Sequence, residues 1–155
     1  LHNDRLNPFI RGHYMLNLAL RGDTKGAEEE YARCRAAFGD LYWHNVVIMN
    51  IRLGSGKVLT KDDVVISDPI YEAVKKHFDS PEKAIAALRQ LYSDADNLNF
   101  HNISNIASLA AYFGDPEFAL AALERTGGSN IYIFLPVNGK VRQLPSFKQY
   151  VKKTG

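Results

Sequence analysis

The chain has 155 residues, of which 46% are hydrophobic and 23% are charged, and its formal net charge is +2. This length and balance suit a single globular domain, residues 1–155, with a core of its own, and they exclude an intrinsically disordered chain. The only cysteine, Cys34, has no partner for an intrachain disulfide. We therefore expect Cys34 to be a core residue in a protein from a reducing compartment.

Membrane insertion is not expected from the apolar runs of the chain. The longest runs, such as residues 131–137, fall far below the roughly 20 residues that a membrane-spanning helix needs. No signal-peptide pattern opens the sequence, so we expect a cytoplasmic protein without a membrane segment. The first residue is Leu1 and the sequence ends at Thr154-Gly155. Both features suggest a segment of a longer protein.

The pattern of apolar residues predicts helices along the whole chain. Apolar positions at helical spacing, bounded by glycine and aspartate, indicate helices over 8–21, 24–38 and 41–53. Residues 55–66 are expected to form a loop, in which Thr60 to Asp63 could cap a short helix, although Val64 to Ile66 is also strand-like. Further helical patterns, several of them opened by proline, occupy 69–78, 81–91, 103–113, 116–123 and 145–153, and residues 131–135 are expected to form a short turn or helix.

Three short turns in this pattern repeat one another. They lie at 22–27, 79–84 and 114–119, each between two apolar runs, and the last two are 35 residues apart. A period near 35 residues is typical of helix-turn-helix repeats. The expected fold is therefore all-α, with antiparallel helix pairs stacked as an α-solenoid and a C-terminal helix capping the stack.

The residues at these turns resemble the tetratricopeptide repeat (TPR). Gly114 and Asp115 match its interhelical Gly-Asp pair, and Ala119 matches the small residue that lets its two helices approach closely. Trp43 and Gly54 fit the first aromatic residue and the turn of another unit. The chain resembles a degenerate TPR array of three or four units, although no second helix is evident after Gly54.

A more specific resemblance covers residues 66–155. This part is similar to the C-terminal TPR region of bacterial multidomain regulators, which carry an adenylate cyclase or winged-helix domain ahead of the repeats. Those proteins fix the last helix onto the array with a Leu-Pro-x-Phe-Lys segment, which Leu144, Pro145 and Phe147 match here. The resemblance implies a role in a bacterial signalling protein, but no catalytic motif of a cyclase lies in these residues.

No motif in the chain predicts a reaction. The segment Gly54 to Lys57 lacks the glycine that a phosphate-binding loop needs five residues earlier, where this chain has Ile51. The five histidines show no metal-ligand spacing, so neither a metal nor a cofactor is expected. The acidic runs 28–30 and 62–63 are interpreted as solvated helix faces. We therefore predict that the chain is not an enzyme.

The candidate binding site is the groove-facing side of one predicted helix. In the TPR register, this side carries His101, Ser104, Ser108 and Tyr112. Hydroxyls and an imidazole beside a ring could bond to a peptide backbone while the ring packs against a side chain. Alternatively, Ser104 and Ser108 only allow close packing of helices and Tyr112 belongs to the core.

These observations predict a non-catalytic interaction module. Its partner would be a protein or peptide, or another domain of the same chain, and the alternative is a sensor with a small-ligand pocket within the helical array. Residues 138–155 contain five basic residues and no acidic one. Such a tail can meet an acidic partner or nucleic acid. We interpret it as the solvated face of the last helix, so nucleic-acid binding is not expected.

Overall fold

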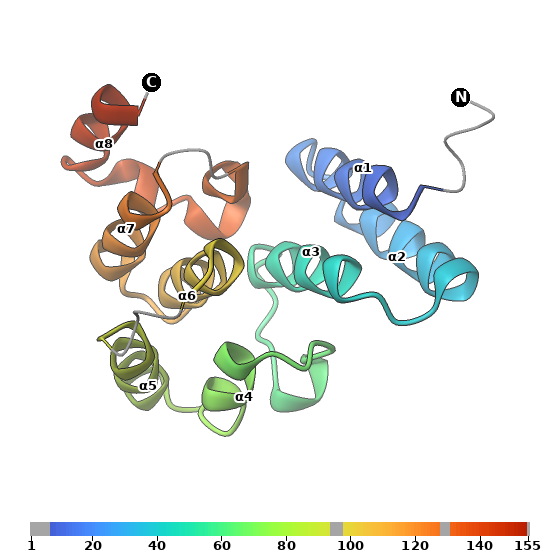
Figure 1. Ribbon diagram of the computed structural model, residues 1–155, viewed down its shortest axis with the longest axis horizontal. Coiled ribbons are helices and arrows are strands. Elements are labelled where there is room, and N and C mark those ends of the chain that lie inside the picture. The colour runs from blue at the N-terminus through green and yellow to red at the C-terminus, as the bar shows by residue number, and fades with distance from the viewer. Residues whose placement is uncertain (1–6, 94–97, 128–130, 155) are drawn as a thin grey trace.

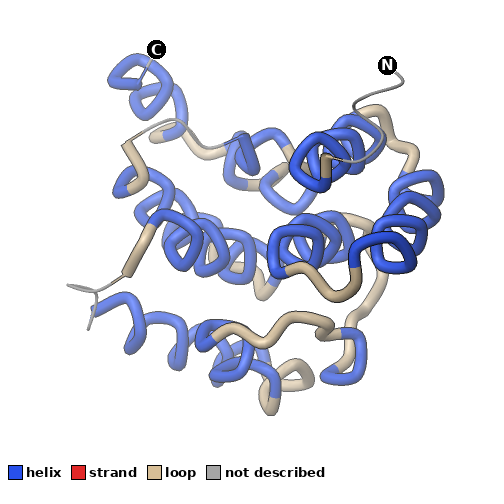
Figure 2. Tube along the Cα trace, turned by 45° about the vertical axis from the view of Figure 1, so that its right-hand side comes forward, coloured by secondary structure: helices blue, strands red, loops and turns tan. Residues whose placement is uncertain are grey.

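The computed structural model describes residues 7–93, 98–127 and 131–154, and every regular element in these ranges is helical (Figure 1). The α-helices are α1 (Pro8–Leu20), α2 (Thr24–Phe38), α3 (Tyr42–Leu53), α4 (Pro69–Lys75), α5 (Pro81–Ser93), α6 (Phe100–Tyr112), α7 (Pro116–Arg125) and α8 (Phe147–Thr154). Short 3₁₀ helices are η2 (Lys61–Asp63), η4 (Ile131–Phe134), η5 (Pro136–Asn138) and η6 (Val141–Gln143). Figure 2 shows no strand in the described ranges, so the all-α prediction is confirmed.

Consecutive helices pair at the three predicted turns. Helix α1 packs on α2, α4 on α5 and α6 on α7, and a short connection joins the two members of each pair. The turn between α4 and α5 has no glycine, and α5 begins there at Pro81. Proline suits this first helical position because its fixed φ matches the helix and its missing N–H would have no partner there.

The turns at Gly22-Asp23 and Gly114-Asp115 have the same bonding pattern. Gly22 and Gly114 have φ values of 82° and 94°, a region in which other residues are strained. In both turns the aspartate N–H donates to the carbonyl five residues earlier, at 2.9 Å. The aspartate side chain then accepts from the N–H three residues later, at 2.8 Å for Asp23 and 3.0 Å for Asp115. Each turn thus ends one helix with a Schellman motif and caps the next.

Helices α3 and α6 lie side by side at the centre of the molecule (Figure 1). Helix α3 contacts α1, α2 and α6, while α6 also contacts α4, α5, α7 and η5. Most residues of both helices are buried. A helix that is buried nearly all round holds its neighbours together, so α6 links the N-terminal helices to the C-terminal part of the chain.

The regular succession of helix pairs is interrupted after α3. Residues 54–68 form a loop whose only described helical element is the 3₁₀ turn η2, so α3 has no paired second helix. The sequence-based expectation of a loop is confirmed, and of the two alternatives within it the structure has the short helix, at Lys61–Asp63, and no strand at 64–66. TPR-like stacking of the whole chain stays a prediction, because this interruption breaks the repeat.

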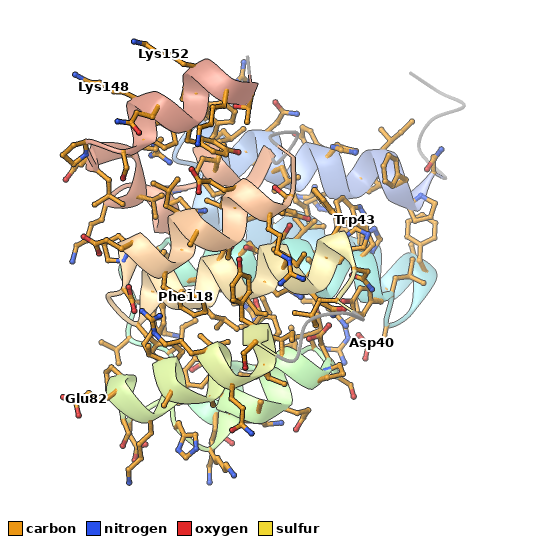
Figure 3. All side chains as sticks on the ribbon, turned by 60° about the vertical axis from the view of Figure 1, so that its left-hand side comes forward. Asp40, Trp43, Glu82, Phe118, Lys148 and Lys152 are labelled. Atoms are coloured by element: carbon orange, nitrogen blue, oxygen red, sulfur yellow. The ribbon has the colours of Figure 1, made fainter. Side chains whose placement is uncertain are left out.

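The C-terminal segment is held by Tyr150 more than by Phe147. Tyr150 is buried, whereas Phe147 is only partly buried against the core. Helix α8 packs on η6, and the Arg142 guanidinium ahead of it donates to the carbonyls of Ile133 and Leu135. Lysines at 148 and 152 extend away from the molecule in Figure 3. Capping of the array by α8 stays a prediction.

Replacing Ala119 by leucine should overpack the α6–α7 pair. Ala119 is fully buried in α7, and added methylene groups in a packed core typically cost about 1 to 3 kcal/mol. Denaturant unfolding followed by circular dichroism would measure this loss. Ala121, two residues along the same helix, is exposed, so Ala121→Leu is the matched control and should change stability by less than about 0.5 kcal/mol. Equal effects of both variants would contradict this helix packing.

Candidate functional site

The four predicted binding residues do not form one open face. Ser104 and Ser108 are buried, and the Ser104 hydroxyl donates to the Phe100 carbonyl at 2.8 Å. His101 is exposed at the start of α6, and Tyr112 is partly buried at its end. The expectation of a continuous polar groove is corrected, because neighbouring helices pack around the middle of α6. A partner role for these residues stays a prediction, and in this conformation only His101 and Tyr112 have exposed side-chain surface.

His101 belongs to a row of rings that crosses three helices. Its ring centroid lies 6.4 Å from that of Trp43 in α3. Trp43 in turn stacks on Phe9 of α1, with centroids 5.5 Å apart, and lies 5.7 Å from His13. We call these four residues the aromatic row. Rings in such contact make a stiff surface that loses little conformational entropy when a ligand packs on it.

Gly12 fixes the position of the indole in this row. A Cβ atom at residue 12 would lie 2.0 Å from the Trp43 Nε1 atom, a distance that no packing allows. The missing side chain therefore lets Trp43 lie directly on the backbone of α1. The Trp43 Nε1 atom is buried there and has no hydrogen-bond partner among the described residues.

The outer face of α1 continues the aromatic row. Phe9, Ile10, Tyr14 and Leu20 are all exposed. At about 100° per residue, they fall within roughly 140° of the helix circumference, next to the arc of buried positions, and they share this side of α1 with His13 and Asn17. Contiguous exposed apolar side chains commonly mark an interaction surface, whereas scattered ones do not.

Tyr112 lies at the opposite end of α6 and contacts the interrupting loop. Its hydroxyl accepts a hydrogen bond from the Leu59 N–H at 2.8 Å. Its ring centroid lies 6.1 Å from that of Phe78 and 5.1 Å from that of Phe113. This contact was not predicted from the sequence, because it joins segments 53 residues apart that no local pattern connects.

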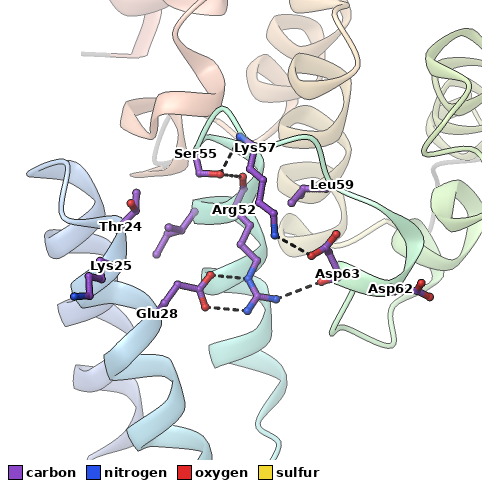
Figure 4. A pocket seen from close by; sticks show the side chains of 10 residues that line it. Thr24, Lys25, Glu28, Arg52, Ser55, Lys57, Leu59, Asp62 and Asp63 are labelled. Carbon is purple, nitrogen blue, oxygen red and sulfur yellow. Dashed lines mark hydrogen bonds and ion pairs between the residues drawn. The ribbon is translucent and has the colours of Figure 1, made fainter.

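A hollow of about 460 Å³ between α2, α3 and η2 is lined by charged residues (Figure 4). Arg52 donates to both carboxylate oxygens of Glu28, at 2.7 and 2.9 Å, and these bonds raise the pKa of Arg52. Lys57 lies 3.5 Å from the Asp63 carboxylate, whose pKa is lowered by hydrogen bonds from Thr60. These charged groups pair with one another. Their bonds tie the loop after α3 to α2 and α3, and this structural role accounts for the charges that line the hollow.

Glu30 overturns one sequence-based interpretation. It was assigned with Glu28 and Glu29 to a solvated face, but its side chain is buried. The guanidinium groups of Arg11 and Arg33 bind its two oxygens, Arg33 at 2.8 Å. Two positive partners offset the large cost of removing a carboxylate from water. Cys34 is buried beside Glu30, as expected, and burial raises the pKa of its thiol to about 11.

The described part of the chain contains neither a metal-binding group of side chains nor a membrane-spanning helix. Among those residues, no group of three or more histidine, cysteine, aspartate or glutamate side chains could hold a metal ion. No helix in the same ranges is long and apolar enough to cross a membrane. Comparison with known proteins returned no matching family model, curated protein or solved structure.

Proposed function

We propose that this chain is a non-catalytic module that binds a polypeptide through the aromatic row and the adjoining outer face of α1. The observation that supports this function is the exposure of apolar side chains along one side of α1, next to rings held in contact across α1, α3 and α6. A chain that left this surface without a partner would keep these apolar side chains in water, which is unfavourable.

The dimensions of the row suit an extended peptide. The centroid steps from Phe9 to Trp43 and from Trp43 to His101 are 5.5 and 6.4 Å. Successive side chains on one side of an extended peptide are about 6.6 Å apart, so neighbouring rings can receive successive side chains. The exposed imidazole of His101 adds a hydrogen-bonding group for the peptide backbone. We expect micromolar affinity, about −8 kcal/mol, as is common for transient interfaces.

The partner in this proposal is another protein or another domain of the same polypeptide. A cytoplasmic bacterial signalling protein is the setting that the TPR resemblance suggests. The alternative, a small-ligand sensor, would place its ligand in a hollow such as the one in Figure 4. That alternative has weaker support, because Arg52 and Lys57 in this hollow already have carboxylate or carbonyl partners.

Site-specific photocrosslinking tests the proposal. A benzophenone amino acid at position 14 places the probe on the outer face of α1, and position 151 on α8 is the control, since Tyr14 and Val151 are 50% and 49% exposed. We expect a crosslinked polypeptide from position 14 and none from position 151. The purified partner should change the emission of Trp43, the only tryptophan. Phe9→Ala should weaken this binding about tenfold.

Three results would overturn this function. The first is equal crosslinking from both positions, and the second is an absence of polypeptide crosslinks from position 14. The third is a partner that binds without changing the emission of Trp43. A small metabolite that raises the melting temperature, without any crosslinked polypeptide, would favour the sensor instead.

A further inference from the structure

A second surface lies at the interruption of the repeat, away from the aromatic row. Two adjoining hollows of about 500 and 590 Å³ share Val58 and Phe78. Val58 is 82% exposed, the most exposed large apolar side chain among the described residues. Other apolar residues lining the hollows are Leu53, Leu59, Pro81, Ala111, Tyr112, Phe113, Pro136 and Val137. We call the two hollows together the lysine-rimmed groove.

The rim of this groove is strongly positive. Five of its lining residues are lysines, at positions 57, 61, 75, 76 and 140, and its only acidic lining residue is Asp79. Lys57 pairs with Asp63, and Lys75 lies 3.9 Å from Glu72. Lys61, Lys76 and Lys140 have no carboxylate within ion-pair distance in the described part of the chain. An apolar floor under unpaired cations is complementary to an amphipathic anion.

Contacts between distant segments fix the walls of the groove. The Tyr112 hydroxyl holds the backbone of Leu59, and Phe78 meets Phe113 edge to face, with centroids 5.3 Å apart. Gly54 lies so close to η5 that a Cβ atom there would be 2.6 Å from the Val137 backbone N. The groove is therefore formed before any ligand arrives, which lowers the entropy cost of binding.

We propose that the lysine-rimmed groove binds an acidic segment of another protein, with one or two apolar side chains of that segment seated on Val58 and Phe78. A lysine ammonium is a compact point charge, whereas an arginine guanidinium binds a single planar group with two parallel hydrogen bonds. A rim of lysines therefore favours a ligand with several carboxylates in a row. Nucleic acid is less well matched, because single-stranded bases need exposed rings to stack on and the Tyr112, Phe78 and Phe113 rings are partly buried.

This second site is independent of the function proposed above. Tyr112 and His101 stand at opposite ends of α6, and a rise of about 1.5 Å per residue separates them by roughly 16 Å along the helix. An acidic peptide in the lysine-rimmed groove should therefore leave Trp43 emission unchanged. Phe9→Ala should also leave the binding of this peptide unchanged. Either binding proposal can therefore be refuted without refuting the other.

Fluorescence anisotropy with defined peptides tests the proposal. The probe is a labelled peptide of about 12 residues, roughly 40 Å when extended, in which glutamates flank two leucines. Two matched peptides replace every glutamate by glutamine or both leucines by serine. We expect saturable binding of the first peptide and at least about tenfold weaker binding of the other two. The affinity should also fall between about 50 and 200 mM salt.

Two charge-reversal variants locate the site. The triple change Lys61→Glu, Lys76→Glu, Lys140→Glu removes the unpaired rim, and Lys148→Glu, Lys152→Glu, Lys153→Glu makes the same charge change on α8. Only the first should weaken peptide binding, by about tenfold or more, while the second should stay within about twofold. Val58→Ser removes the apolar contact at the bottom of the groove without adding a charge, and it should weaken binding similarly. Circular dichroism should confirm that each variant keeps its helical spectrum.

Several outcomes would overturn the proposal. They are an absence of saturable binding up to about 1 mM peptide, equal binding of the glutamine peptide, or equal loss in both triple variants. Tighter binding of single-stranded RNA or of anionic vesicles, lost in the rim variant alone, would assign the groove to nucleic acid or a membrane surface instead. In each case Trp43 emission and the crosslinking at position 14 still report on the aromatic row separately.

Discussion

Replacing Arg11 by methionine should lower the free energy of unfolding by about 3 kcal/mol, one of the two largest effects we expect from a single change. Arg11 bridges α1 to the Glu30 carboxylate of α2, and the Glu30 side chain is almost completely covered. Methionine keeps much of the apolar stem of Arg11 but removes the charge. Glu30 would then stay buried with the weak Cys34 thiol contact and one described cation, Arg33, whose side chain is mostly in water. Urea unfolding followed by circular dichroism measures the change.

Two further variants separate charge from packing in this ion pair. Glu30→Gln in the Arg11→Met background removes the uncompensated carboxylate, so it should recover a large part of the lost stability. Arg33→Met should cost less than about 1 kcal/mol, because Arg33 is exposed and surface ion pairs contribute little. If Arg11→Met had the stability of the wild type within about 0.5 kcal/mol, Glu30 would not be buried as described.

Replacing Ile106 by alanine should cost about 2 to 5 kcal/mol. Ile106 is fully buried in α6, the helix that contacts α3, α4, α5 and α7. A cavity in this helix should therefore weaken both ends of the chain together. Trp43 emission reports on α1 and α3, and far-ultraviolet circular dichroism reports on all helices. We expect both signals to shift to the same lower denaturant midpoint.

The control for Ile106→Ala is Ile85→Ala in α5. Ile85 is only partly buried, so the same truncation should cost clearly less. A linear array of repeats can lose its end units separately, whereas a chain joined through one central helix unfolds in a single transition. If Ile106→Ala moved the circular dichroism transition but left the Trp43 transition in place, α6 would not couple the two ends.

The helical class and the turns could be predicted because their signals are local. At Gly22-Asp23 and Gly114-Asp115, a glycine with positive φ ends one helix and an aspartate begins the next. The preference for glycine at a helix end and the preference for aspartate at a helix start each depend on about six neighbouring residues and little on the rest of the fold. The predicted helix limits are therefore close to the observed ones.

The candidate site could be predicted only in part, because burial is decided by distant segments. Ser104 and Ser108 sit on the side expected to face a groove, but the helices packed around α6 leave them buried. Glu30 looked like part of an exposed acidic run, and its burial depends on Arg11, 19 residues earlier in the sequence. The contact between Leu59 and Tyr112 joins residues 53 apart. No local pattern contains such information.

The loop that follows α3 lines one side of the lysine-rimmed groove but buries few of its own side chains. Residues 54–63 are mostly exposed, and within this stretch only Leu59 is buried. Substitutions at its exposed positions can change the shape and charge of one side of the lysine-rimmed groove without opening a cavity in the core. A regular second helix here would have to keep an apolar stripe against α3. Substitutions at the exposed positions of this irregular segment can therefore alter the charge and shape of the groove with little risk to folding.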